Sequence, residues 1–312
     1  MRDPIHVFGG NGNPELLQEI CDYLGLAPGR VEIRRFSNEN LFVQIQENVR
    51  ETDVFVVQPF SSPVHENIME LLIMLDALRS ASASRITAVI PYYSYSRSDK
   101  KDQPRISITG RLMADLLVTA GANRVLTMNL HKHQVHGFFS VPTDHLYAAP
   151  VMLEYFRDVD RNSTVVVAPD AGHVKEASSY AERLGLPLAF VDKRRISDSH
   201  VETNAIVGDV RGKRVIVFDD EISAGTSLIA TVQILQRHGV QSIRAAAVHG
   251  VLCDHAVEKI ADSPIEEVVV TNTVPVPPEK RIDRIKVLSV GYLFAEAIKR
   301  IHSGESISSL FV

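Results

Sequence analysis

The chain has 312 residues, of which 45% are hydrophobic and 23% are charged, close to the average of globular proteins. This composition excludes disordered and fibrous proteins, and no apolar run approaches the roughly 18 residues of a membrane span. A net charge of −5 does not indicate a nucleic-acid binder. Two cysteines are too few for a disulfide framework, and no apolar signal core follows the first residues. We therefore expect a cytoplasmic protein with two domains, without a membrane or nucleic-acid partner.

Short β-branched runs alternate with amphipathic stretches along the chain, a pattern typical of α/β folds with mainly parallel sheets flanked by helices. In chain order, the expected strands are 54–57, 86–90, 125–128, 165–168, 215–218, 243–248 and 268–270. The expected helices are 66–82, 108–120, 173–184 and 227–239, the last of which ends at a glycine suited to a C-cap. Ligands of such folds bind beyond the carboxyl ends of the strands, so these ends are the places to inspect.

Short sequence matches also recur at a spacing of about 160 residues, which indicates an internal duplication. Leu-Gly-Leu at 24–26 recurs at 184–186, and Arg-Arg-Phe-Ser at 34–37 recurs as Arg-Arg-Ile-Ser at 194–197. We expect two similar domains, residues 1–146 and 147–312.

Two adjacent carboxylates, Asp219 and Asp220, follow the apolar run at 215–218. A turn of small and hydroxyl residues comes next, made of Ser223, Ala224, Gly225, Thr226 and Ser227. Hydroxyls and backbone N–H groups at a helix N-terminus suit a phosphate. Paired carboxylates suit the vicinal hydroxyls of a sugar, directly or through a divalent cation. The motif therefore indicates a sugar phosphate, and the alternative is an ordinary turn that caps a helix.

This segment resembles the ribose-phosphate motif of the type I phosphoribosyltransferase fold, and the rest of the chain resembles the ribose-phosphate pyrophosphokinase family. The similar segments follow the family's order: Asn67–Asp76, Ala88–Tyr92, Gly137–Phe139, Asp144–Ala148, Pro169–Gly172, Val207–Val210 and Gly304–Ser306. The resemblance implies two tandem phosphoribosyltransferase-like domains and an enzyme of nucleotide biosynthesis. Such an enzyme moves the diphosphoryl group of ATP to the anomeric hydroxyl of ribose 5-phosphate, giving 5-phosphoribosyl 1-diphosphate and AMP, with Mg²⁺ as cofactor.

The repeat assigns different roles to the two halves. At the same spacing, Gln58 and Pro59 occupy the places of Asp219 and Asp220, and they cannot supply a carboxylate pair. The ribose 5-phosphate site is therefore expected in the second half alone. The resemblance implies that the degenerate first domain supplies ATP contacts and subunit packing in a homo-oligomer built from dimers, with a hexamer as one candidate form.

The resemblance also implies roles for individual residues. Those expected to bind ATP are Phe36, Asn38, Asn40, Arg97, Ser98 and His131. Those expected to contact the metal are His131 and Asp170, and the catalytic residues of a flexible loop are Lys193 and Arg195. A lysine and an arginine over the transferring group would stabilise the charge of the transition state. No P-loop motif occurs, which disfavours a P-loop kinase.

Several residues depart from the family's pattern. The departures are Ser98 for glutamine, Asn129 for an acid, His173 for glycine, Asn40 for glutamate, and Lys132 and His133 for small neutral residues. They leave open the preference for ATP and the regulation by phosphate or ADP. The segment Asp219–Thr226 is also one residue shorter than in most of this family. Two alternatives to an active pyrophosphokinase follow from these departures, namely a catalytically silent regulatory homologue and a phosphoribosyltransferase.

Overall fold

The computed structural model describes residues 5–195 and 202–310, without the side chains of residues 193–195 and 202–204. Contacts divide the chain into two units. The first comprises Met1–Ala148, Thr273–Pro275 and Ser289–Val312, and the second comprises Ala149–Asn272 and Val276–Leu288. Across the described part of the chain, no helix is both long enough and apolar enough to cross a membrane.

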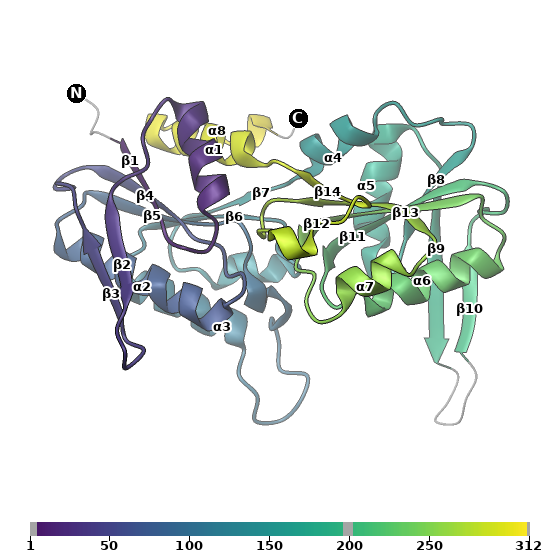
Figure 1. Ribbon diagram of the computed structural model, residues 1–312, viewed down its shortest axis with the longest axis horizontal. Coiled ribbons are helices and arrows are strands. Elements are labelled where there is room, and N and C mark those ends of the chain that lie inside the picture. The colour runs from purple at the N-terminus through teal and green to yellow at the C-terminus, as the bar shows by residue number, and fades with distance from the viewer. Residues whose placement is uncertain (1–4, 196–201, 311–312) are drawn as a thin grey trace. The chain divides into compact units, whose positions relative to one another are not determined.

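The first unit is built on a five-stranded parallel sheet with the strand order β1-β4-β5-β6-β7 (Figure 1). Its strands are β1 (Ile5–Gly9), β4 (Asp53–Val57), β5 (Arg85–Ile90), β6 (Arg124–Met128) and β7 (Thr143–Leu146). Helices α2 (Val64–Ser80) and α3 (Thr109–Ala120) cover one face, and α1 (Pro14–Leu24) and α8 (Gly291–Ser303) cover the other. Strands β2 (Val31–Arg35) and β3 (Leu41–Ile45) form a separate antiparallel hairpin.

Helix α8 packs on the first unit although it comes last in the chain. Arg85 donates a hydrogen bond to the carbonyl oxygen of Ile301 at 3.1 Å, and His302 Nδ1 lies 2.8 Å from Asp53 Oδ2. At the start of the helix, Ser289 Oγ donates to Glu19 Oε2 of α1 at 2.5 Å. The end of the segment 147–312, which was expected to form the second domain, therefore contributes to the core of the first unit.

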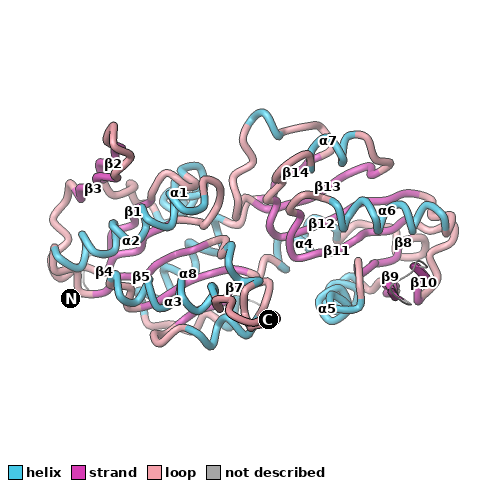
Figure 2. Tube along the Cα trace, turned by 90° about the horizontal axis from the view of Figure 1, so that it is seen from below, coloured by secondary structure: helices cyan, strands magenta, loops and turns pink. Residues whose placement is uncertain are grey.

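The second unit contains a seven-stranded sheet with the order β10-β9-β8-β11-β12-β13-β14, parallel except for the pair β9–β10. Its strands are β8 (Thr164–Ala168), β9 (Leu188–Arg195), β10 (Glu202–Val207), β11 (Arg214–Ile222), β12 (Ser242–Gly250), β13 (Ile265–Thr271) and β14 (Ile285–Leu288). Helices α6 (Thr226–Arg237) and α7 (Ala256–Ala261) cover one face, and α4 (Ala149–Phe156) and α5 (Val174–Leu184) cover the other (Figure 2).

Helices on both faces explain why the strands are apolar at almost every position. Successive side chains of a strand point to opposite faces of the sheet. In β11, Val215 and Val217 pack with α6, whereas Ile216 and Phe218 pack with α5. The ring of Phe218 stacks on Tyr180 of α5 with the ring centroids 4.2 Å apart. Both faces of β11 are therefore buried up to the point where its acids begin.

The predicted fold class is confirmed, and each predicted strand and helix has a counterpart in the structure. Strands β1-β4-β5-β6-β7 repeat as β8-β11-β12-β13-β14 with the same parallel order, which supports the internal duplication. Several boundaries differ from the prediction, and three of them belong to β11, which holds the acid pair, and to helices α5 and α6. Strand β11 continues to Ile222, α5 begins after a 3₁₀ turn at Ala171–His173, and α6 ends at Arg237, before Gly239 adopts a left-handed φ of 71°.

Candidate active site

The acid pair lies inside strand β11, near its carboxyl end, and not behind the strand as the sequence indicated. Asp219 pairs with Ala247 of β12, and the strand runs two residues beyond Asp220. Asp220 is 5% exposed, and its N–H donates to Asp219 Oδ1 at 2.9 Å. Burial, with the charge of Asp220, raises the pKa of Asp219 to about 7. Two carboxylates held this close favour a cation or hydroxyl donors beside them.

His173 faces these acids from the 3₁₀ turn after β8. Its Nδ1 lies 2.9 Å from Asp170 Oδ1, and its Nε2 lies 3.3 Å from Asp220 Oδ1 and 3.5 Å from Asp219 Oδ1. The hydrogen bonds to Asp170 and then Asp220 raise the pKa of His173 to about 10, so the imidazole carries a positive charge at neutral pH. The sequence left open whether His173 meets a phosphate, and the structure places it against three carboxylates.

Asp170 begins the same 3₁₀ turn. Its Oδ1 accepts hydrogen bonds from the N–H groups of Gly172 at 2.8 Å and His173 at 3.3 Å. These bonds fix the turn that aims His173 at Asp219 and Asp220. The turn after β8 and the end of β11 are thus joined by charged side chains, because β8 and β11 are neighbours in the sheet.

The loop Ser223–Ser227 consists of the turn after β11 and the first two residues of helix α6. Gly225 has a φ of 72°, a left-handed conformation that favours glycine, and it precedes the first turn of α6. Thr226 and Ser227 are exposed there, beside N–H groups that lack intrahelical acceptors. Residues that the sequence did not single out contact this loop. Cys253 Sγ lies 3.2 Å from Ser223 Oγ, and Lys259 donates to the carbonyl oxygen of Ala224 at 2.8 Å.

Lys193 and Arg195 lie at the carboxyl end of β9. Their backbones pair with Asn204 and Glu202 of the antiparallel strand β10. Their side chains are outside the described part of the structure, so their predicted contact with the transferring group is a matter for experiment.

In the first unit, Phe36, Asn38 and Asn40 lie at the tip of the β2–β3 hairpin. The N–H of Phe36 donates to the carbonyl oxygen of Asn40 at 2.9 Å, and the phenyl ring is 45% exposed. The Arg34 guanidinium lies 5.5 Å from the centre of that ring. An exposed aromatic face on a tight hairpin can stack on a nucleotide base.

The other predicted ATP-binding residues follow strands β5 and β6. Arg97 is exposed at the end of the 3₁₀ helix η1 (Ser94–Arg97), and His131 is half-buried after β6. Ser98 Oγ accepts a hydrogen bond from the N–H of Thr109 at 2.9 Å, so this hydroxyl supports the start of α3. Asn129 Oδ1 accepts from the N–H of Ala148 at 2.8 Å, and this amide therefore ties the exits of β6 and β7 together.

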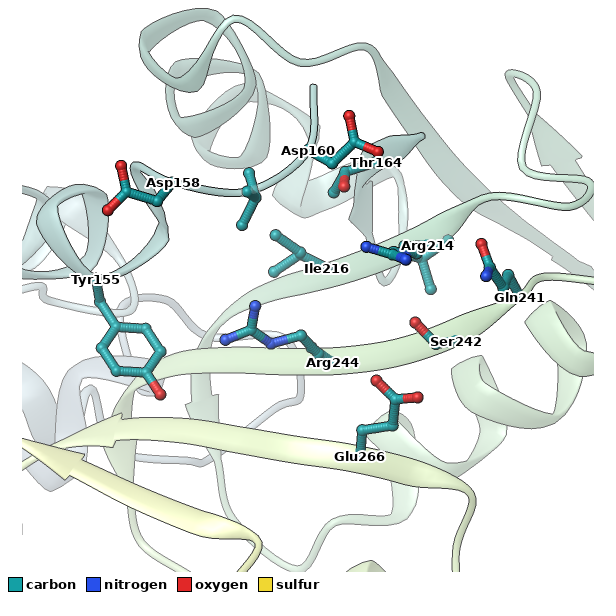
Figure 3. A pocket seen from close by; sticks show the side chains of 12 residues that line it. Tyr155, Asp158, Asp160, Thr164, Arg214, Ile216, Gln241, Ser242, Arg244 and Glu266 are labelled. Carbon is teal, nitrogen blue, oxygen red and sulfur yellow. The ribbon is translucent and has the colours of Figure 1, made fainter. Parts of the chain in front are cut away.

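A hollow of about 660 Å³ in the second unit lies at the opposite, amino-terminal ends of the strands (Figure 3). Arg244 extends there toward Tyr155, and both groups hydrogen-bond Glu267. Besides Arg214 and Arg244, the hollow is lined by three carboxylates, those of Asp158, Asp160 and Glu266. This charge balance does not favour a phosphate, and none of the predicted site residues lines the hollow.

Comparisons with known proteins find relatives that match this chain over nearly its whole length. The sequence profile of the N-terminal domain of ribose phosphate pyrophosphokinase matches residues 5–121, and that of the phosphoribosyl synthetase-associated domain matches residues 199–312. The ribose-phosphate pyrophosphokinase of Deinococcus radiodurans is 53% identical over 99% of this chain and 98% of its own length. The chain belongs to the ribose-phosphate pyrophosphokinase family.

Further relatives match over the same length. The ribose-phosphate pyrophosphokinase of Caldanaerobacter subterraneus is 49% identical over 98% of both chains. The crystal structure of phosphoribosylpyrophosphate synthetase from Mycobacterium smegmatis is 40% identical, with a TM-score of 0.91, over 96% of this chain and 99% of that one. The predicted activity, that of a ribose-phosphate diphosphokinase, is thereby confirmed. A full-length match at this identity does not fit the phosphoribosyltransferase alternative.

Proposed function

We propose that the end of β11 and the following loop bind ribose 5-phosphate. The observation that carries the proposal is that one strand delivers both parts of the sugar-phosphate motif: Asp219 and Asp220 within the strand and the loop Ser223–Ser227 directly after it. The carboxylates accept hydrogen bonds from the vicinal hydroxyls of the ribose. The N–H groups and exposed hydroxyls at the start of α6 accommodate the 5-phosphate. The anomeric hydroxyl is thereby held as the acceptor of the transfer.

ATP is bound by residues of the first unit. Phe36 stacks on the base, with Asn38 and Asn40 beside it on the same hairpin tip. Arg97 supplies an exposed positive charge for the phosphates, and His131 contacts the nucleotide or its metal. The hydroxyl of Ser98 hydrogen-bonds the start of α3, so its contribution to ATP binding is indirect.

The residues after β8 fit a Mg²⁺ ion that accompanies ATP. Magnesium prefers carboxylate oxygens and water, and Asp170 presents a carboxylate whose side chain is 38% exposed. Asp170 would hold the ion, and His131 of the first unit is separately predicted to contact a metal. When bound, the ion neutralises charge on the diphosphoryl oxygens. His173 lies within 3.5 Å of all three carboxylates, those of Asp170, Asp219 and Asp220.

The transfer forms a bond between the anomeric oxygen of the ribose and the β-phosphorus of ATP. The bond between that phosphorus and the oxygen bridging it to the α-phosphate breaks, AMP leaves, and the hydroxyl proton is released. Lys193 and Arg195 are the catalytic residues, because cations over the diphosphoryl group stabilise the charge that spreads over its oxygens during transfer. The protein acts as a homo-oligomer, and its cytoplasmic location stays a prediction.

The test is to incubate the purified protein with ATP, Mg²⁺ and ribose 5-phosphate and to follow AMP and 5-phosphoribosyl 1-diphosphate. We expect equal amounts of both products, with no AMP when ribose 5-phosphate is left out. Lys193→Ala serves as the matched inactive control. Folded protein that forms no AMP under these conditions would support the silent regulatory homologue instead.

A further inference from the structure

Lys259 lies at the loop that follows the acid pair, although it comes from a different part of the chain. It belongs to helix α7 and is half-buried. Its Nζ donates to the carbonyl oxygen of Ala224 at 2.8 Å and lies 3.3 Å from Thr226 Oγ1. A single ammonium group therefore holds two members of the loop Ser223–Ser227.

The bond to Ala224 fixes the direction of a backbone N–H. In a trans peptide the carbonyl and the N–H of the next residue point in opposite directions. Because the carbonyl oxygen of Ala224 faces Lys259, the N–H of Gly225 points away from α7. The left-handed φ of Gly225, 72°, completes this turn into α6. Lys259 thus sets the orientation of the peptide that opens the helix.

The contact with Lys259 determines whether the Thr226 hydroxyl donates or accepts a hydrogen bond. A hydroxyl has one proton to donate and two lone pairs that accept, whereas an ammonium group can only donate. Thr226 Oγ1 must accept from Lys259, so its own proton is directed to another acceptor. The exposed position of Thr226 leaves that acceptor to be a ligand or water.

The charge of Lys259 is unusual for its position. The N-terminus of a helix carries a partial positive charge and is stabilised by anions, whereas a cation there is unfavourable. Lys259 nevertheless contacts the first residue of α6, and α6 has no side-chain cap. A bound phosphate dianion would satisfy the helix terminus and the ammonium group together.

We propose that Lys259 is a positioning residue for the 5-phosphate of ribose 5-phosphate: it orients the Ala224–Gly225 peptide and the Thr226 hydroxyl, and it adds positive charge to the loop. The inference rests on the proposed ribose 5-phosphate site and specifies which distant side chain prepares it. It assigns a role in recognition to helix α7, which follows the neighbouring strand β12.

The test compares Lys259→Met, Lys259→Arg and the control Lys213→Met. Lys213 is a half-buried lysine of the same unit that pairs with Asp209 at 3.0 Å, away from the loop. For Lys259→Met we expect the KM for ribose 5-phosphate to rise roughly 10- to 100-fold, with the KM for ATP and kcat within about threefold. Lys259→Arg should recover most of the affinity, and Lys213→Met should change nothing.

Thermal melting separates this role from a structural one. Without ligand, the Tm of Lys259→Met should stay within about 2 °C of the parent. The lost hydrogen bond is offset because an unfavourable cation is removed from the N-terminus of α6. The rise in Tm caused by ribose 5-phosphate should shrink, since ligand stabilisation follows the ratio of concentration to Kd. A large fall of the ligand-free Tm with an intact ligand-induced rise would overturn the proposal.

Thr226→Ala distinguishes failure of the proposal from failure of the site. If Thr226→Ala weakens ribose 5-phosphate binding but Lys259→Met does not, the site stands and Lys259 has no part in it. If neither variant changes the KM for ribose 5-phosphate, the proposed site itself is wrong. If Lys259→Met does not fold, Lys259→Gln replaces it, because glutamine keeps an N–H donor for Ala224 without the charge.

Discussion

Strands β4 and β11 occupy equivalent places in the two sheets, but different residues stand at their carboxyl ends. After β4, Gln58 is fully buried, and its Oε1 accepts from the N–H of Gly12 at 2.9 Å. Its Nε2 donates to Glu70 Oε1 of α2 at 2.8 Å. A Cβ at Gly10 would lie 2.7 Å from the Gln58 amide, so this end of the sheet is filled.

The end of β11 instead holds Asp219 and Asp220, with a raised pKa on Asp219 and a charged His173 beside them. Duplication thus preserved the strand and changed what stands at its end. A neutral amide closes the first sheet through hydrogen bonds within the protein. In the second sheet, two close carboxylates are stabilised by positive charge or hydroxyl donors placed beside them. This property suits a substrate site.

The largest expected contrast in kcat is between residues of the antiparallel pair β9–β10 in the second unit and residues of the hairpin β2–β3 in the first. Lys193→Ala and Arg195→Ala should each lower kcat by about 10²–10³, with little change in either KM, because they act on charge that develops during transfer. The double variant should lose less than the product of both, since the two residues serve one group. Steady-state kinetics checks this.

The repeat supplies a control for these two variants. Arg35, the counterpart of Arg195, pairs with Glu39 at 3.0 Å and Glu66 at 3.6 Å on the surface. Arg35→Ala should change kcat less than about threefold, because exposed ion pairs contribute little. If the Lys193 and Arg195 variants instead raise KM with kcat preserved, the loop is a substrate clamp. A large loss of Tm in those variants would make both residues structural.

Gln58→Ala tests the closed end of the first sheet. It removes the buried acceptor of the Gly12 N–H and one of the donors to the Glu70 carboxylate, which should lower the free energy of unfolding by about 2–3 kcal/mol. The KM for ribose 5-phosphate should not change. Chemical denaturation measures the loss, and a selective rise in that KM would contradict the division of roles between the halves.

Asp220→Asn tests the open end of the second sheet. The apparent affinity for ribose 5-phosphate should fall about tenfold or more, whereas the affinity for ATP changes little, because the carboxylates address the sugar. Calorimetric titration with each substrate checks this. Equal losses for both substrates would mean that the pair holds a shared metal or has a structural role.

His173→Ala should reveal a smaller, pH-dependent contribution to stability. The pKa of His173 is raised from an ordinary value of 6.5 to about 10, chiefly by Asp170 and Asp220. A raised histidine pKa stabilises the fold fully below about pH 6.5, and this stability is lost as the pH rises through about 10. The parent should therefore melt a few degrees above His173→Ala at pH 6, and the difference should vanish by pH 10 to 11. A difference that grows with pH would refute the charged contact.

Lys132→Ala should have the smallest effect on basal turnover. Lys132 is half-buried at the start of the 3₁₀ helix η2 (His133–Phe138) in the first unit. We expect a changed response to inorganic phosphate or ADP, with turnover in their absence nearly intact, because the family uses small neutral residues here. Activity measured over a range of phosphate and ADP concentrations checks this. Unchanged curves would mean that Lys132 has no part in regulation.

The sequence by itself determined the alternation of strands and helices, the duplication, and the place of the acid pair and hydroxyl loop along the chain. These features depend on local patterns: apolar runs for strands buried on both faces, periodic apolar positions for helices, and small residues at a strand-to-helix turn. The contrast between Gln58 and Asp219 was also readable, because the repeat at a spacing of about 160 residues aligns the two positions without knowledge of contacts.

The tertiary structure alone decided which distant residues meet. Strand β11 ends at Ile222 and not at residue 218 as predicted, because pairing with β12 extends the strand past its apolar run. It placed α8 on the first unit, His173 against three carboxylates, and Lys259 on the loop at Ala224. Each of these contacts depends on neighbouring strands in the sheet or helices packed on it, and no local pattern encodes a partner that lies tens or hundreds of residues away.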